Sequence, residues 1–479
     1  MTARRIGLWT GPLAFLLIYF LFRPDGLPLA GTAVLAVTAW MAIWWTTEAI
    51  SIAVTAMLPI ILFPLTGVLS AAETTASYGH YLVFLFLGGF VIAMAVERWN
   101  LHRRIALGII VLVGSSQRMI ILGAMLATAF LSMWISNTAT SVMMLPIAMA
   151  IAAQLADDPR TDVDENKQFG KALMLAIAYS ASIGGMASLI GTPVNGVLLG
   201  QVETVFGVQI GFMDWFQIGF PVSVVLLVIC WFYLTRVAFQ LQSTSFEGGR
   251  SEIQRLRAEL GPMSYEERMV TVVFTLTALS WVFRKSLLTG LVPGINDTVI
   301  AMIGATLLFL IPTKGGDRTL LTWEEAKTLP WGVVLLLGGG FALAAGFTAG
   351  GLAEWVEGNL RVPEAVGLFA IILLVTAAVN FFTEITSNVA TTSMLLPVLA
   401  VVAGPLGVAP ASLMVPATLA ATCAFMLPVA TPPNAVVFGS GYLTIPDMVR
   451  AGFRMNVVSI LIITLACYFL LPYLGGFTF

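Results

Sequence analysis

Long apolar stretches recur along this chain, and each comes close to the roughly 20 residues that a helix needs to cross a bilayer. Only 10% of the residues are charged, against about 25% in a typical soluble domain. The sequence therefore predicts an all-α polytopic membrane protein with about eleven transmembrane helices. Candidate spans lie near residues 6–22, 28–47, 51–69, 81–97, 213–235, 269–284, 296–311 and 451–473, and two more begin near 172 and 411.

The first apolar run follows Arg4 and Arg5, as the core of a signal peptide would. It ends in Phe22-Arg23-Pro24-Asp25 and has no convincing small-residue cleavage site. We therefore expect residues 1–27 to form a retained N-terminal span. Further on, arginines and a tryptophan stand beside a short apolar run that ends at Val113, which suits a helix lying in the membrane interface.

Two long apolar stretches are interrupted by small polar residues. The stretch 118–155 contains Ser136-Asn137-Thr138, and the stretch 364–403 contains Ser387-Asn388-Val389. The first is too long for one comfortable span, so it is either a tilted helix or a hairpin that enters the membrane and returns with the triplet at its tip. Polar groups in hydrocarbon need partners, so both interruptions are candidate functional sites.

Two further apolar segments are broken by threonine and proline, at Gly191-Thr192-Pro193 and at Ala430-Thr431-Pro432. Proline lacks a backbone donor and restricts the residue before it, so each motif predicts a broken helix. These landmarks recur in order, 251 residues apart for the triplets (388 − 137) and 239 for the following asparagines (434 − 195). An internal duplication explains this order. It predicts repeats at 28–240 and 269–479, joined by the charged linker 241–268.

Basic residues predict the orientation, because cytoplasmic loops are rich in Lys and Arg. If both interrupted stretches are re-entrant hairpins, one path through the membrane places three basic groups in the cytoplasm: Arg4 with Arg5, Arg98 to Arg104, and Arg250 to Arg268. That path puts the N-terminus inside and makes the two repeats inverted. Arg284 and Lys285 fall outside and count against it.

The four interruptions offer hydroxyls, amides and freed backbone carbonyls, and none contains Lys or Arg. Such oxygen-rich clusters suit a hard monovalent cation, while helix N-termini after each break favour an anion. A dianion would be costly to hold in a low-dielectric cavity without a basic side chain, and co-bound cations would offset that cost. We therefore expect cation-coupled anion transport, with several anions and either Na⁺ or another small cation still possible.

Other classes of function fit less well. A net charge of −2 gives no reason to expect a nucleic-acid partner. The two histidines lie near segment ends, and Cys230, Cys423 and Cys467 are scattered through apolar segments, so neither an enzyme nor a metal centre is expected. A channel is disfavoured because no ring-like filter motif is present.

The paired triplets, the two Thr-Pro turns, Trp45-Thr46-Thr47-Glu48 and Phe382-Thr383-Glu384 resemble the divalent anion/sodium symporter family over nearly the whole chain. That family comprises sodium-coupled dicarboxylate, citrate and sulfate carriers. The resemblance implies a homodimer in a bacterial inner membrane. It also implies an elevator-type fold, in which a transport domain moves against a scaffold.

Carried over residue by residue, the resemblance implies two Na⁺ sites and one substrate site. The first Na⁺ site would use Ser132, Ser136, Asn137 and Gly191, and the second would use Thr383, Ser387, Asn388 and Ala430. The substrate-binding residues would be Asn137, Thr138, Pro193, Ser387, Asn388, Val389, Thr431 and Pro432.

Val389 departs from the Ser-Asn-Thr triplet that many dicarboxylate carriers repeat, which leaves the preferred anion open. We expect Na⁺-coupled symport of C4 dicarboxylates such as succinate, malate and fumarate. The alternatives are a Na⁺-coupled citrate or tricarboxylate carrier and a Na⁺-independent dicarboxylate exchanger. Glu384, three residues before the second triplet, is either a proton carrier or a hydrogen-bonded structural carboxyl.

Overall fold

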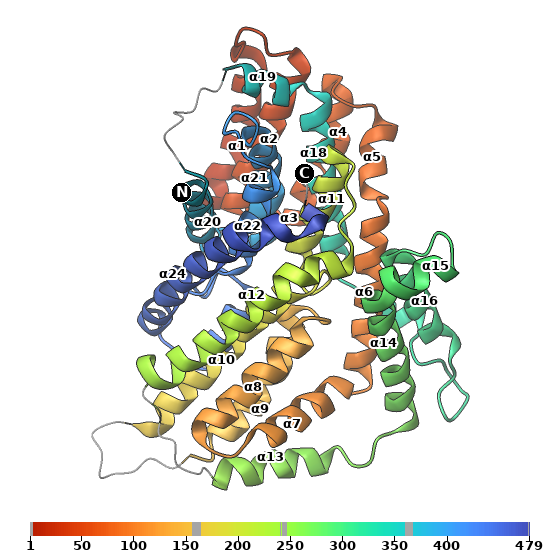
Figure 1. The fold of residues 1–479 in the computed structure, drawn as a ribbon, viewed down its shortest axis with the longest axis vertical. Helices are drawn as coiled ribbons and strands as arrows, with labels where there is room; N and C mark the ends of the chain where they lie inside the picture. Colours follow the sequence, from red (N-terminus) through yellow and green to blue (C-terminus); the bar gives the residue numbers. More distant parts are fainter. Residues whose placement is uncertain (1–2, 156–163, 240, 242–246, 360–366, 478) are drawn as a thin grey trace.

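The computed structural model describes residues 3–155, 164–239, 241, 247–359, 367–477 and 479. Regular structure in these ranges is helical, apart from one isolated bridge between Pro312 and Thr319 (Figure 1). The predicted all-α fold class is confirmed. Short parts of the predicted N-terminal span, linker and second hairpin, at 1–2, 242–246 and 364–366, lie outside the described residues.

The first half of the chain forms twelve α-helices within the described ranges. They are α1 (Ala3–Leu21), α2 (Leu29–Thr47), α3 (Ile52–Thr55), α4 (Leu58–Thr66), α5 (Ala71–Tyr78), α6 (Tyr81–Arg98), α7 (Leu101–Val113), α8 (Gln117–Ser132), α9 (Asn137–Ala152), α10 (Glu165–Ala187), α11 (Pro193–Phe206) and α12 (Phe212–Phe232). A π-helical turn, Tyr233–Ala238, continues α12.

The second half begins with a helix inside the predicted linker. Its described helices are α13 (Glu247–Glu259), α14 (Tyr265–Phe283), α15 (Thr289–Leu291), α16 (Asp297–Leu310), α17 (Trp323–Ala326), α18 (Trp331–Ala349), α19 (Leu352–Asn359), α20 (Leu368–Phe382), α21 (Asn388–Val402), α22 (Ala411–Thr422), α23 (Pro432–Phe438) and α24 (Ile445–Phe469). The end of α14 and the start of α15 are joined by a π-helical turn, Arg284–Leu288.

Seven helices in the described ranges are long and apolar enough to cross a membrane. Apart from α1, which has 19 residues and is not among the seven, the remaining apolar helices are shorter. One predicted span differs for a clear reason. The span predicted at 51–69 is divided into α3 and α4. Pro59 stands in the first turn of α4, where its missing N–H is tolerated, so the break falls just before it.

Both interrupted stretches fold as two short helices instead of one long helix. The helices α8, α9, α20 and α21 have 15 or 16 residues, which at 1.5 Å per residue gives ~24 Å. That is short of the ~30 Å hydrocarbon core, as expected of re-entrant hairpins. In the first hairpin α8 packs on α9 and on α10, whereas in the second α20 and α21 both pack on α22.

The two halves of the chain are interleaved around their broken helices. The second helix of the first hairpin, α9, packs against α23, which follows the break in the second half. In the same way α21 packs against α11, which follows the break in the first half. The helix α18 lies against both α11 and α21. This crosswise packing brings segments far apart in sequence to one region of the molecule.

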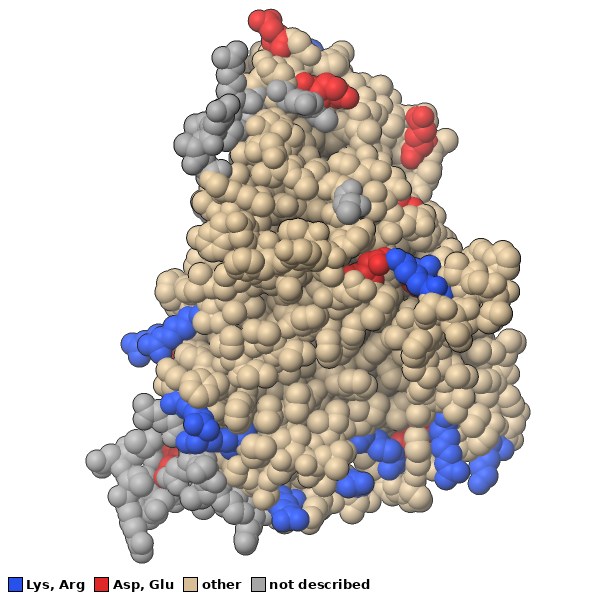
Figure 2. All heavy atoms as spheres, in the orientation of Figure 1, with Lys and Arg blue, Asp and Glu red and all other residues tan. Residues whose placement is uncertain are grey.

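Basic residues gather at one end of the molecule. In Figure 2 most Lys and Arg side chains lie toward the lower end and the left edge, while acidic side chains are prominent at the upper end. The helices α7 and α13 pack together and cross that lower end, as an interfacial segment would (Figure 1).

Glu325 is paired with two of the basic residues, Arg98 and Arg318. Burial alone would raise the pKa of Glu325, but hydrogen bonds from Arg318 and Arg98 lower it to about 2.

The two basic residues that oppose the predicted orientation are both ion-paired. Arg284 Nε lies 2.6 Å from Asp297 Oδ1, and Lys285 Nζ lies 2.7 Å from Asp214 Oδ1. The bias that sets orientation counts Lys and Arg with little regard to neighbouring acidic residues, so both residues still count against the predicted path. The orientation itself stays a prediction.

Candidate functional site

The tip of the first hairpin is organised by a hydrogen bond between two of the predicted Na⁺ ligands. The hydroxyl of Ser132, at the end of α8, donates to Asn137 Oδ1 at the start of α9 over 2.7 Å. Ser136 is the N-cap of α9, and its Oγ accepts from the backbone N–H of Ala139 at 3.2 Å. A serine cap satisfies a helix donor that would otherwise lack a partner. Side-chain hydrogen bonds therefore hold the turn between α8 and α9, in addition to the backbone that links the two helices.

The break after α10 is tied to that hairpin tip by Ser188. Its hydroxyl donates to the carbonyl of Met133 in the turn of the hairpin. The same oxygen accepts from the N–H of Gly191 at 3.1 Å. Asn195, one turn into α11, donates from its amide to the carbonyl of Ser188 over 2.7 Å. The break is thus a braced loop, and it holds Gly191 beside the hairpin.

Two glycines allow this close approach. A Cβ added to Gly191 would lie 2.9 Å from the carbonyl oxygen of Ser132, and one added to Gly185 would collide with the side chain of Asn137. Any larger residue at either position would force the hairpin tip away from the break. The structure therefore brings Ser132, Asn137 and Gly191 together, as the prediction for the first Na⁺ site requires.

The tip of the second hairpin repeats the first hydrogen bond with a threonine. Thr383 Oγ1 donates to Asn388 Oδ1 over 2.8 Å and lies 3.2 Å from the carbonyl oxygen of Ala421 on α22. Ser387 stands at the N-cap of α21, as Ser136 does for α9, but its side chain makes no capping bond. Thr383 and Asn388 of the second predicted Na⁺ site are therefore in direct contact. The hydroxyl of Ser387 does not cap α21.

The break after α22 is held to its hairpin by Glu384. This carboxylate is 3% exposed and accepts the backbone N–H groups of Met426 at 2.9 Å and Leu427 at 3.1 Å. Asn456 on α24 donates its amide to the same carboxylate at 2.7 Å. These hydrogen bonds hold the break and α24 against the hairpin. They favour a structural role for Glu384 over that of a proton carrier.

The remaining predicted residues of the second half lie at the end of that break. Ala430 and Thr431 are buried, and Thr431 Oγ1 accepts from the N–H of Asn434 at 3.3 Å as the N-cap of α23. The amide of Asn434 donates to the carbonyls of Ala424 and Leu427, at 3.1 and 3.0 Å. Asn434 thus braces its break as Asn195 braces the other.

The predicted substrate residues differ in their exposure. Thr138 and Pro432 are exposed, while Asn137, Pro193, Ser387, Asn388 and Val389 are partly exposed. These positions stand at the starts of α9, α11, α21 and α23, which pack crosswise between the two halves. Their oxygens are hydroxyl, amide and carbonyl oxygens, which suit hard monovalent cations and can also hydrogen-bond an anion.

Sequence reasoning missed the residues that brace the site. Three polar residues were not singled out although all are fully buried: Ser188, Asn380 and Asn456. Ser188 bonds the hairpin turn, and the two asparagines bond the backbone of the second break. Asn380 donates to the carbonyl of Cys423 over 2.7 Å. A lone amide within an apolar span, such as Asn380 or Asn456, is the signal that could have identified them.

Two helical hairpins, two broken helices and polar side chains at every break are the architecture of a secondary transporter. Comparison with known proteins identifies the family. Residues 6–475 match the family model described as the sodium:sulfate symporter transmembrane region. The chain therefore belongs to the sodium:sulfate symporter family, and it is a membrane transporter and not an enzyme.

Curated relatives match along nearly the whole chain. It is 47% identical over 473 residues to the sodium-dependent dicarboxylate transporter SdcS of Staphylococcus saprophyticus, covering 98% of this chain and 91% of the relative. It is 46% identical over 481 residues to the SdcS of Staphylococcus aureus strain MRSA252, covering 99% of this chain and 92% of that relative.

Solved structures share the fold at low sequence identity. Neisseria gonorrhoeae MtrF matches with a TM-score of 0.58 at 12% identity, over 96% of this chain and 97% of its own. The Alcanivorax borkumensis YdaH transporter matches with a TM-score of 0.57 at 14% identity, over 88% of this chain and 90% of its own. Both are membrane transporters by their descriptions, and they support the transporter fold alone.

Proposed function

We propose that this chain couples the inward movement of Na⁺ to the uptake of C4 dicarboxylates such as succinate, malate and fumarate. The observation that carries the proposal is the pair of equivalent hydrogen bonds, Ser132 to Asn137 and Thr383 to Asn388, at two hairpin tips. The family is described as sodium symporters, and the two relatives are named as sodium-dependent dicarboxylate transporters, which supports both the ion and the substrate class.

Sodium is required in this proposal because of the charge of the substrate. None of the site residues proposed here carries a positive side chain, and the surroundings are largely buried. A dianion in such a low-dielectric site would be strongly disfavoured without compensating charge. Two bound sodium ions would supply two positive charges and align the amides of Asn137 and Asn388 toward the carboxylates.

The proposal gives each residue a role, and Asn137, Ser387 and Asn388 each serve both a Na⁺ site and the substrate. The first Na⁺ is held by Ser132, Ser136, Asn137 and the carbonyl of Gly191, and the second by Thr383, Ser387, Asn388 and the carbonyl of Ala430. The substrate carboxylates meet Asn137, Thr138, Ser387, Asn388 and Thr431, while Pro193, Val389 and Pro432 shape the pocket. Release to the other side follows an elevator movement of the hairpins and broken helices, in a homodimer with cytoplasmic N-termini.

Uptake of radiolabelled succinate into proteoliposomes tests the proposal. An inward Na⁺ gradient should raise the initial rate at least tenfold over an equal K⁺ gradient, and malate and fumarate should compete. Equal rates in Na⁺ and K⁺ would contradict sodium coupling. Preloading the vesicles with unlabelled succinate, without Na⁺, separates symport from exchange, because only an exchanger accelerates under that condition.

The second candidate function is that of a Na⁺-coupled tricarboxylate carrier, and the presence of valine at position 389 favours it. Val389 places a methyl group where the first half has the hydroxyl of Thr138. Citrate and sulfate in the same competition assay separate the substrates. Inhibition by citrate at lower concentration than by succinate would replace the C4 assignment with the tricarboxylate one.

A further inference from the structure

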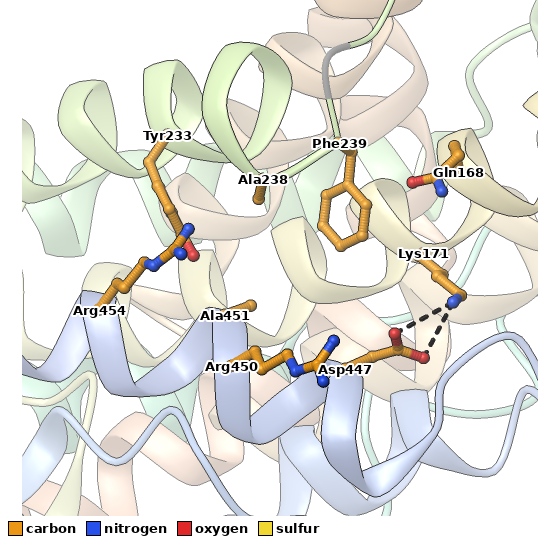
Figure 3. A pocket seen from close by; sticks show the side chains of 9 residues that line it. All are labelled: Gln168, Lys171, Tyr233, Ala238, Phe239, Asp447, Arg450, Ala451 and Arg454. Atoms are coloured by element: carbon orange, nitrogen blue, oxygen red, sulfur yellow. Dashed lines mark hydrogen bonds and ion pairs between the residues drawn. The ribbon is translucent and has the colours of Figure 1, made fainter. Parts of the chain in front are cut away.

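A cavity of about 270 Å³ lies away from the hairpin tips, between the start of α10, the π-helical end of α12 and the start of α24 (Figure 3). Its walls include Lys171 of α10, Tyr233 at the end of α12, and Asp447, Arg450 and Arg454 of α24. None of these residues belongs to the proposed transport site.

The cavity carries an excess of positive charge. Lys171 Nζ pairs with Asp447, 3.0 Å from Oδ2 and 3.1 Å from Oδ1. Arg454 lies against the side chain of Tyr233. Arg450 points along the cavity and has no ion-pair partner in the part of the chain that the structure describes (Figure 3). Three cationic side chains against one carboxylate leave two positive charges (3 − 1 = 2) for a ligand to neutralise.

The helices beside the cavity present apolar side chains to the outside. On α24, Arg450 and Arg454 are one turn apart, and the same stripe continues into Val457 and Leu461, which are 39% and 46% exposed. On the neighbouring helix α12, Phe232 is 49% exposed. We expect apolar side chains exposed in this way on adjacent helices of a membrane protein to face lipid tails. The positive cavity therefore stands where the lipid-facing surface ends.

We infer that this cavity binds the phosphate headgroup of an anionic phospholipid, with the acyl chains lying along the exposed apolar faces of α12 and α24. The volume is slightly below the roughly 300–1,000 Å³ of pockets that enclose whole drug-sized ligands, so it suits a headgroup and leaves the chains outside. Arginine guanidinium groups match phosphate oxygens in a bidentate geometry, and basic pockets between membrane helices take anionic headgroups. The lipid would join α10, α12 and α24 at one end.

Native mass spectrometry of the full-length protein in detergent tests this inference without any transport measurement. The protein is titrated with short-chain phosphatidylglycerol, with short-chain phosphatidylcholine, and with inorganic phosphate or glycerol phosphate. The test variant is R450Q/R454Q. The matched control is R250Q/R257Q, which removes two exposed arginines from α13. A third variant, R450K/R454K, keeps both positive charges but loses the planar guanidinium groups that bind phosphate in a bidentate manner.

Wild-type protein should bind phosphatidylglycerol more tightly than phosphatidylcholine. In R450Q/R454Q the affinity for phosphatidylglycerol should fall about fivefold for each arginine removed, while the α13 control keeps wild-type affinity and the lysine variant is intermediate. Equal losses in the test and control variants would overturn the inference. Saturable binding of inorganic phosphate or glycerol phosphate as tight as that of the lipid would also overturn it, by showing that the occupant is a soluble anion.

Discussion

The two hairpin-and-break units of this transporter share one hydrogen bond but are braced by different chemistry. In both, a hydroxyl at the end of the first hairpin helix donates to the amide oxygen of the asparagine that begins the second. The first break is then tied to its hairpin by the small hydroxyl of Ser188. The second, longer break is tied by the carboxylate of Glu384, which Asn456 supports from α24.

The difference teaches that the two units share the groups proposed to face the ion while their supporting contacts differ. A short break needs one hydroxyl to reach its neighbour, and Ser188 supplies both a donor and an acceptor. The longer break exposes more backbone N–H groups, and a buried carboxylate can accept several of them at once. The second unit therefore depends on a single ionisable side chain, and the first does not.

The largest expected effect tests what the two units share. Replacing Asn137 or Asn388 with alanine removes an amide proposed to serve both a Na⁺ site and the substrate. Each change should reduce Na⁺-driven succinate uptake by about 100-fold or more, the effect of ~2.7 kcal/mol. Proteoliposome uptake measures the loss, and size-exclusion chromatography shows that the protein remains folded. Near-normal uptake in either variant would contradict the proposal that Asn137 and Asn388 have equivalent roles in the two units.

The second prediction tests how they differ. In Glu384→Ala, two partly buried backbone N–H groups and the Asn456 amide lose their acceptor, at ~1 kcal/mol or more for each group. The apparent melting temperature should fall by roughly 5 °C or more. Ser188→Ala loses only two such partners and should lie nearer to wild type. Thermal unfolding followed by tryptophan fluorescence measures both, and equal shifts would show that the two braces contribute alike.

The sequence was enough to predict the shared features. The length of the apolar stretches and their low charge predicted the helices. The repeated triplets and Thr-Pro turns located the hairpin tips and breaks, because polar groups in hydrocarbon are conspicuous. The contact between Ser132 and Asn137 spans only five residues, and local spacing is visible in a sequence. The likeness to a known family supplied the assignment of individual ligands.

The bracing could not be predicted because its contacts are long-range. Ser188 reaches Met133 across 55 residues, and Asn456 reaches Glu384 across 72. Sequence spacing says nothing about which distant carbonyl or carboxylate a lone polar side chain will meet. The division of the predicted span at 51–69 was missed for a local reason, since Pro59 could have been read as the first turn of a new helix.

The third prediction compares the two hydroxyl donors. Ser132→Ala and Thr383→Ala should each raise the Na⁺ concentration for half-maximal uptake by about tenfold, the effect of ~1.4 kcal/mol. Thr383→Ala should have the larger effect, because Thr383 also contacts the carbonyl of Ala421. Thr383→Ser keeps the hydroxyl and should stay close to wild type. A Na⁺ response unchanged by both alanine variants would separate these hydroxyls from the ion sites.

The smallest expected effect concerns the one position at which the triplets differ. Thr138 is exposed, whereas Val389 is partly exposed and packs against the two larger clusters of buried apolar side chains in the described residues. Val389→Thr places a hydroxyl of nearly the same volume on this side of the site, and Thr138→Val is its matched reverse. If Val389 shapes the substrate site, Val389→Thr should shift the ratio of succinate to citrate inhibition constants by about threefold to tenfold, or 0.6–1.4 kcal/mol.

The two variants together separate packing from substrate choice. If Val389 only packs, the inhibition ratio would stay constant, and the added hydroxyl would cost ~1–3 kcal/mol of stability where it has no hydrogen-bond partner. A valine that faces the anion would change the ratio, and Thr138→Val would change it in the opposite sense because it removes a hydroxyl where Val389→Thr adds one. An unchanged ratio in both variants would place substrate selection at the shared residues instead of at the one difference between the units.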